Sequence, residues 1–255
     1  MKLEVLGCAG GEGGGHRATA FLINDNILLD AGSVAGVLTL QQQAQLRYAL
    51  ISHAHLDHVK DLGFIIDNSF ASRSRPLRVL AEAPVIKALQ DHFFNWTIWP
   101  DFGRLRNDSG AVLELECMSG RIELEGLIIE SIEVNHPGRA FGFVIQDAAS
   151  GNSIVITGDT AETDAIWRRA SELSDLRAVF VDTAFPNDMA ELARVSGHLT
   201  PAGLLQQLEQ YGLQDSCVYC YHLKPAYHDT VLSDIRGLGR SNIVALQQGE
   251  CLSWP

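Results

Sequence analysis

Three imidazoles and one carboxylate fall within six consecutive residues, positions 53–58, which read His-Ala-His-Leu-Asp-His. Nitrogen and oxygen donors this close together can ligate two neighbouring metal ions. At average residue frequencies, this arrangement arises by chance in a chain of this length about once in a thousand sequences. A solvated polar loop is therefore a poor explanation, and we interpret the hexamer as part of a metal site.

The apolar segment at positions 48–51 predicts a strand that leads into the hexamer. The hexamer should then form a loop at the carboxyl end of that strand, where α/β folds place their sites. In a locally extended run, His53 and His55 project to the same side and can hold one ion. The turn through Asp57 and His58 directs the next pair toward a second ion. Four ligands are too few for two ions, so others must come from later in the chain.

Three later residues stand at the tips of predicted strands and suit this task. His136 precedes a Pro-Gly turn and suits the first ion. Asp159 follows Gly158, which lets the backbone approach a bound group, and its carboxylate can bridge both ions. His222 follows an apolar strand and suits the second ion. The seven residues together form a complete set of ligands for two ions.

The elements that position these residues fall into two β-rich halves, each accompanied by helices. Apolar patterns predict early strands at 3–6, 20–23, 27–29, 48–51 and 77–81, and helices at 59–70 and 84–94. Later strands are predicted at 111–117, 122–124, 127–134, 141–146, 153–157, 178–182 and 218–221, with helices at 162–173, 201–211 and 229–238. Two sheets that pack on each other, with helices on both outer faces, satisfy this order. We therefore predict an α/β fold, a four-layer αββα sandwich.

Composition favours a single domain over residues 1–255. The chain is 46% hydrophobic and 20% charged, enough for a large core, and contains no linker or repeat that would divide it. The first residues lack a signal-peptide core, and no apolar run approaches the ~18 residues of a membrane span. We expect a cytoplasmic protein without membrane association.

The net charge of −12 argues against a long nucleic acid as partner. Proteins that grip nucleic acids usually carry basic surfaces to displace phosphate counterions, whereas this chain has 31 acidic and 19 basic residues. A small-molecule substrate is favoured.

The five cysteines suit reduced thiols better than a disulfide framework. Cys217 and Cys220 admit a redox or zinc interpretation. Their β-rich surroundings instead predict core or half-buried thiols on opposite faces of a strand.

At the positions of the seven candidate metal ligands, the chain resembles the metallo-β-lactamase superfamily. The His-x-His-x-Asp-His motif, later His, bridging Asp and final His of that superfamily occur here in the same order. The sequence Asp-Ala-Gly at 30–32 is also common in that superfamily. Within it, the chain is most similar to the class II cyclic nucleotide phosphodiesterases. The marks are Leu56 within the hexamer, Ser-Gly-His-Leu-Thr-Pro at 196–201 and His-Leu-Lys-Pro at 222–225. A departure is Asp61, where that family usually has a small residue.

The resemblance implies a dinuclear-metal phosphodiesterase that hydrolyses a small phosphodiester, cyclic AMP or cyclic GMP, to the 5′-monophosphate. Two ions can lower the pKa of a shared water, so that a bridging hydroxide attacks phosphorus in line while the ions neutralise the phosphoryl oxygens. An imidazole-rich ligand set favours Zn²⁺, with Mn²⁺ or iron as alternatives. The resemblance to the superfamily also implies a homodimer.

We expect Asp57 and His198 to be catalytic residues. His198 lies in a Gly-His-Leu-Thr-Pro turn before a helix and is the candidate proton donor to the leaving alkoxide. The alternatives are that it braces the loop or contacts phosphate. Asp182, at a strand end, orients a ligand histidine or forms an ordinary turn.

Other functions remain open on the same ligands. A tRNA 3′-processing nuclease shares them, but the acidic balance opposes it. A thioester hydrolase of the glyoxalase II kind also uses a bridging Asp. A non-catalytic, metal-stabilised binding protein would keep the ligands without hydrolysis.

Aromatic residues cluster at 93–99, where they predict buried core in preference to purine stacking or a dimer contact. His16, His92 and His228 are predicted to be surface residues.

Overall fold

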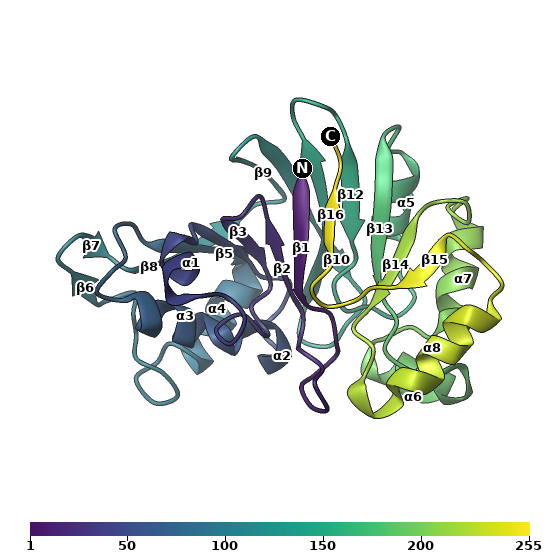
Figure 1. The fold of residues 1–255 in the computed structure, drawn as a ribbon, viewed down its shortest axis with the longest axis horizontal. Coiled ribbons are helices and arrows are strands. Elements are labelled where there is room, and N and C mark those ends of the chain that lie inside the picture. Colours follow the sequence, from purple (N-terminus) through teal and green to yellow (C-terminus); the bar gives the residue numbers. More distant parts are fainter.

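Two seven-stranded sheets lie between helices in the computed structural model, which describes all 255 residues (Figure 1). The first sheet runs in the order β16 (Cys251–Ser253), β1 (Lys2–Gly7), β2 (Ala20–Ile23), β3 (Ile27–Leu29), β4 (Tyr48–Leu50), β5 (Leu77–Glu82), β8 (Leu113–Met118). The second runs β15 (Ile243–Ala245), β14 (Val218–Tyr221), β13 (Leu176–Asp182), β12 (Ser153–Ile156), β11 (Ala140–Asp147), β10 (Leu127–Val134), β9 (Arg121–Leu124). A two-stranded ribbon of β6 (Arg106–Asn107) and β7 (Gly110–Ala111) stands apart.

Helices cover the outer face of each sheet, so the predicted four-layer αββα sandwich is confirmed (Figure 1). The first sheet carries α1 (Leu40–Gln45), α2 (Leu56–Val59), α3 (Asp61–Ser69) and α4 (Ala83–His92). The second carries α5 (Ala165–Ser171), α6 (Ala190–Ser196), α7 (Pro201–Gln210) and α8 (His228–Gly237), with short 3₁₀ turns η1 (Asn187–Met189) and η2 (Pro225–Tyr227). None of these helices has the length and apolar character that a bilayer span requires.

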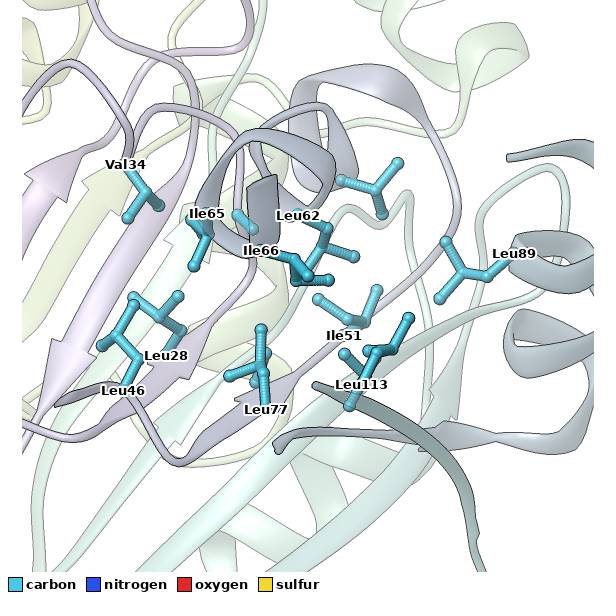
Figure 2. Close-up of a cluster of buried hydrophobic side chains, with 14 of the residues drawn as sticks. Leu28, Val34, Leu46, Ile51, Leu62, Ile65, Ile66, Leu77, Leu89 and Leu113 are labelled. Carbon is cyan, nitrogen blue, oxygen red and sulfur yellow. The ribbon is translucent and has the colours of Figure 1, made fainter. Parts of the chain in front are cut away.

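The hydrophobic core is divided by the two sheets. One cluster lies between them and includes Phe21, Phe143 and Phe180. Figure 2 shows the cluster beneath the helices of the first sheet, where Ile65 and Leu62 of α3 pack toward the strands. A third cluster lies under the helices of the second sheet. Burial on both faces explains why the central strands read as continuous apolar runs instead of alternating patterns.

Strand direction gathers the chemically active loops at one edge. In the second sheet β12, β13 and β14 are parallel, and β10 points the same way because β11 is antiparallel to both β10 and β12. In the first sheet β3, β4 and β5 are parallel. The loops that follow these carboxyl ends therefore meet between the sheets, and Phe141 of β11 joins them by donating its N–H to the Ser52 carbonyl oxygen at 3.1 Å.

Several local expectations need correction. The predicted helix at 59–70 is α3, which spans 61–69. The hexamer is not entirely a loop as predicted, because its last three residues lie in the preceding helix α2. Helix α5 is shorter than the predicted 162–173. Cys217 is exposed because β14 begins only at the next residue, whereas Cys220 is buried as expected. The aromatic segment is only partly core: Phe93 and Phe94 are buried, but Trp96 is 58% exposed in a loop where its φ is +65°.

Candidate metal centre

The seven predicted ligands converge at the shared strand edge. They form two groups of three in which the ligand atoms lie within 4.8 Å of one another: His53, His55 and His136 in one, and Asp57, His58 and His222 in the other. Asp159 lies between the groups, with its Oδ2 at 3.7, 3.2 and 3.1 Å from the Nε2 atoms of His53, His58 and His222. The hexamer and the strand tips, far apart in sequence, thus face a common centre.

His222 reaches this centre through a strained backbone. Its φ is +64°, a conformation that costs a non-glycine residue about 1–3 kcal/mol unless its surroundings hold it. The His222 N–H donates to the Cys8 carbonyl oxygen at 2.6 Å. Gly10 packs directly on the ring, because a Cβ there would lie 2.7 Å from His222 Cδ2. The Gly-rich loop therefore holds the imidazole in place.

Two of the histidines have their Nδ1 atoms fixed by acceptors. His58 Nδ1 lies 2.7 Å from Asp30 Oδ2, and His136 Nδ1 lies 2.8 Å from the Gly197 carbonyl oxygen. A carboxylate or a carbonyl only accepts, so each Nδ1 carries the proton. In the neutral imidazole, each Nε2 then has a free lone pair directed at the centre.

Hydroxyl groups hold the Nδ1 atoms of two further histidines. His53 Nδ1 lies 3.0 Å from Ser52 Oγ, which in turn donates to Asp30 at 2.8 Å. His222 Nδ1 lies 3.0 Å from Thr19 Oγ1, whose proton is directed at a backbone carbonyl. Each hydroxyl therefore accepts from the imidazole, so these Nε2 atoms also carry free lone pairs. This arrangement of supported imidazoles is typical of metal-binding histidines.

The centre contains polar atoms that no protein group satisfies. The Nε2 atoms of His53 and His58 and the Oδ1 of Asp159 are buried without a hydrogen-bond partner. His136 Nε2 faces His55 Nδ1 at 3.2 Å. Unpaired buried polar atoms are costly, and cations bound among them would satisfy them. Imidazoles with a few carboxylates are donors that suit zinc and other transition ions. The residues present thus fit a divalent metal centre.

The electrostatics agree with that fit. Burial lowers the pKa of His53 and of His222 well below the ordinary value, which favours the neutral imidazole that binds metals. Burial alone would also lower the pKa of His58, but Asp159 and Asp30 raise it well above the ordinary value, so a metal that binds at His58 Nε2 must displace a proton. Burial would raise the pKa of Asp159, but the imidazoles of His222 and His58 lower it well below its usual range. An anionic Asp159 thus attracts positive charge to the centre.

His198 lies beside the metal centre, on the side of α6 and α7. It is buried, and its Nδ1 lies 2.7 Å from Asp182 Oδ2, so its Nε2 points away from that carboxylate. Its ligand atom lies within 4.8 Å of those of His136 and Asp159. Asp182 also accepts from the Thr160 N–H at 3.0 Å. Asp182 therefore orients His198 instead of one of the seven predicted ligands.

Sequence reasoning missed the residues that support the ligands. The sequence marks Asp30 only as part of a common Asp-Ala-Gly motif, yet its side chain contacts His58 directly and His53 through Ser52. Thr19 and the Gly197 carbonyl carried no signal, because their roles depend on contacts between distant segments. Asp30 did carry one: an Asp after an apolar strand at the same edge as the hexamer.

Asp61 has a local structural role. It is buried, and its Oδ2 accepts the N–H groups of Val34 and Ala35, both at 2.7 Å. Its Oδ1 accepts from Lys60 at 2.8 Å. The carboxylate thus holds the turn that follows Asp30, which explains how a larger residue is accommodated here. The rings predicted to be on the surface are peripheral: His92 is exposed, and His16 and His228 are half-buried and pack on each other.

Comparisons with known proteins agree with this geometry. Residues 25–222 match the model of the family described as the beta-lactamase superfamily domain. A probable 3′,5′-cyclic-nucleotide phosphodiesterase of Yersinia pestis is 28% identical, over 98% of this chain and 84% of that protein. A 3′,5′-cyclic-nucleotide phosphodiesterase of Aliivibrio fischeri is 27% identical, over 98% of this chain and 92% of that protein. The crystal structure of unliganded yeast PDE1 has the same fold, with a TM-score of 0.81, 18% identity and 98% coverage of both chains.

Proposed function

The chain belongs to the beta-lactamase superfamily, and from that premise we propose that it is a metal-dependent 3′,5′-cyclic-nucleotide phosphodiesterase. Its substrate is a small phosphodiester, cyclic AMP or cyclic GMP, which it hydrolyses to the 5′-monophosphate. The names of the relatives from Yersinia pestis and Aliivibrio fischeri support this activity. The observation that carries the proposal is the set of free imidazole nitrogens that converge on Asp159.

Two divalent ions fit the donors. His53, His55 and His136 would hold one, Asp57, His58 and His222 the other, and Asp159 lies where it can contact both. Bound there, the ions supply Lewis acidity, which neutralises charge on the phosphoryl oxygens and makes water a stronger nucleophile at neutral pH. The five imidazoles favour Zn²⁺, with Mn²⁺ or iron as alternatives.

The chain's own contribution to bond cleavage is a proton. Hydrolysis to the 5′-monophosphate breaks the bond between phosphorus and the 3′ oxygen, and the departing alkoxide must be protonated. His198 can donate from Nε2 because Asp182 binds its Nδ1 and stabilises the imidazolium. Burial alone would lower the pKa of His198, but Asp182 raises it above the ordinary value. Asp57, a half-buried carboxylate 3.7 Å from His222, would anchor the second ion at the mouth of the centre.

The Asp182–His198 pair distinguishes the proposed phosphodiesterase from a glyoxalase II-like thioester hydrolase. A thiolate leaves readily without protonation, whereas an alkoxide does not. A buried Asp182–His198 pair beside the metal ligands therefore serves a phosphodiester better than a thioester. A tRNA 3′-processing nuclease is disfavoured by the net charge of −12.

Turnover of three kinds of substrate, a cyclic nucleotide, a generic diester and a thioester, tests the proposal. Zinc- or manganese-loaded protein should hydrolyse cyclic AMP or cyclic GMP and the generic diester bis(p-nitrophenyl) phosphate, but not S-lactoylglutathione. Asp159→Ala should abolish the diester activities. Cleavage of the thioester alone would favour the glyoxalase II alternative, and inactivity on all three with metals bound would favour a binding role. A homodimer and a cytoplasmic location complete the proposal, and light scattering of the metal-loaded protein tests the first.

A further inference from the structure

Lys224 brings an unpaired positive charge to the edge of the metal centre. Its Nζ lies 3.4 Å from His222 Nε2, where it is placed to donate a hydrogen bond to that nitrogen, and its only polar partner is this ring. The side chain is half-buried. An ammonium in such a position has lost part of its hydration without gaining an acidic partner, which is unfavourable unless another anion binds there.

Other basic side chains around the same edge are neutralised. Lys60, two residues after the hexamer, contacts Glu12 at 2.9 Å and Asp61 at 2.8 Å. Arg194 of α6 contacts a glutamate of its own helix at 2.6 Å. Among these residues Lys224 alone has no carboxylate partner, and it is therefore the one best able to bind an anion from solution.

The backbone holds Lys224 at this place. Its N–H donates to the Ala184 carbonyl oxygen at 3.1 Å, and its own carbonyl accepts from Tyr227 at 2.9 Å. Pro225 then opens the short turn η2. The backbone of Lys224 is thus anchored between the loop after β13 and the start of α8, and only its side chain is free to adjust.

The ammonium also shares a side of the centre with the proposed proton donor. The rings of His198 and His222 are stacked, with centroids 5.3 Å apart and an interplanar angle of 19°. Lys224 contacts the edge of the same His222 ring. A phosphoryl group placed against His222 and within reach of His198 would therefore have oxygens facing Lys224.

We propose that Lys224 binds a non-bridging oxygen of the phosphoryl group, in the diester substrate and in the monophosphate product. This inference rests on the proposed function and adds a specificity residue to it. Lysine binds phosphate as a compact point charge. It would stabilise a bound anionic phosphoryl group but not a neutral thioester group. Lys224 thus selects for anionic substrates at a centre whose ligand set alone does not.

Binding of inorganic phosphate tests the inference without turnover. Calorimetry on zinc-loaded protein should show phosphate binding about 10-fold more weakly to Lys224→Met than to wild type. Lys87→Met is the matched control, because Lys87 is 75% exposed on α4 and paired with Asp91. It removes the same charge away from the centre and should leave phosphate affinity unchanged. Equal phosphate affinity in Lys224→Met and wild type would overturn the inference.

Metal content and kinetics complete the test. Lys224→Met should retain the zinc content of wild type, whereas its KM for bis(p-nitrophenyl) phosphate and its inhibition constant for 5′-AMP should both rise about 10-fold. A fall in zinc content would show that Lys224 supports the ligands instead and would overturn the inference. If wild type does not hydrolyse cyclic nucleotides but Lys224→Met still binds phosphate more weakly, the proposed substrate fails while the role of Lys224 stands.

Discussion

Asp30 Oδ2 accepts the Nδ1 proton of His58 at 2.7 Å, and the same carboxylate reaches His53 through the Ser52 hydroxyl. One side chain thus sets the tautomer and orientation of a histidine in each of the two ligand groups. Asp30 adopts a φ of +58°, which Asp and Asn tolerate better than other side chains do. The two halves of the centre therefore share a single support.

Asp30→Asn should weaken metal binding. Asn preserves the size and backbone preference of Asp30, but it keeps only one accepting oxygen. If that oxygen stays with the Ser52 N–H, an NH2 donor replaces the oxygen that accepts from His58 and from the Ser52 hydroxyl. We expect zinc affinity to fall about 10–100-fold, measured by competition with a chromophoric chelator. Asp25→Asn removes an exposed carboxylate and should leave zinc affinity unchanged. Equal affinities in all three proteins would show that Asp30 does not support the ligands.

His198→Asn should impair substrates according to their leaving groups. An alkoxide needs a proton from His198, whereas p-nitrophenolate leaves without one. We expect the kcat for cyclic AMP to fall by about 10²–10⁴, and the kcat for bis(p-nitrophenyl) phosphate to fall much less. Equal losses on both substrates would contradict the donor role and favour a structural role for His198 in its loop.

Gly197→Ala should displace the ligand His136, because the added Cβ would collide with its ring. Gly197 has a φ of +81°, and a Cβ there would lie 2.7 Å from His136 Nδ1 and 2.5 Å from Pro137 Cδ. Gly212→Ala is the matched control, since Gly212 has a φ of +71° and nothing lies within 4 Å of its Cβ position. Both variants should lose about 1–2 kcal/mol of unfolding free energy through backbone strain, and Gly197→Ala should lose more. Zinc affinity should fall in Gly197→Ala only, and a fall in both would refute the displacement argument.

Removal of metal should lower thermal stability. The folded chain presents converging donors that the unfolded chain cannot, so metal at about 100 times its Kd adds about 2.7 kcal/mol to the free energy of unfolding. For a chain of this size that corresponds to a fall in Tm of about 5 °C or more on chelation. Asp159→Ala should show little change in Tm between loaded and chelated samples. A similar chelation effect in this variant and in wild type would place the metal elsewhere.

Much of the fold follows from local pattern. Strands β10 and β14 occur where they are predicted, because both are rich in β-branched, aromatic or other apolar residues and are bounded by polar or turn-forming residues. The short helices α1 and α6 were not predicted, since six or seven residues carry little periodic signal. Trp96 was misplaced because a hydrophobic ring on a strained loop gives the same sequence pattern as a core residue.

The candidate site was likewise only partly predictable from the sequence. His136, Asp159 and His222 are candidate ligands from the sequence because each follows an apolar strand, and parallel strands bring their carboxyl ends together. Asp30 and Lys224 were not assigned roles, because a role as support or as anion binder depends on partners that lie elsewhere in sequence. Spacing thus indicates ligands, whereas their supports require the tertiary structure.

The most direct test of the central claim is the product formed from cyclic AMP in ¹⁸O-labelled water by the zinc- or manganese-loaded protein. The account predicts 5′-AMP with one labelled phosphoryl oxygen, and none of this product after chelation or with Asp159→Ala. Formation of 3′-AMP, or no hydrolysis of cyclic AMP or cyclic GMP by folded, metal-loaded wild type, would contradict it.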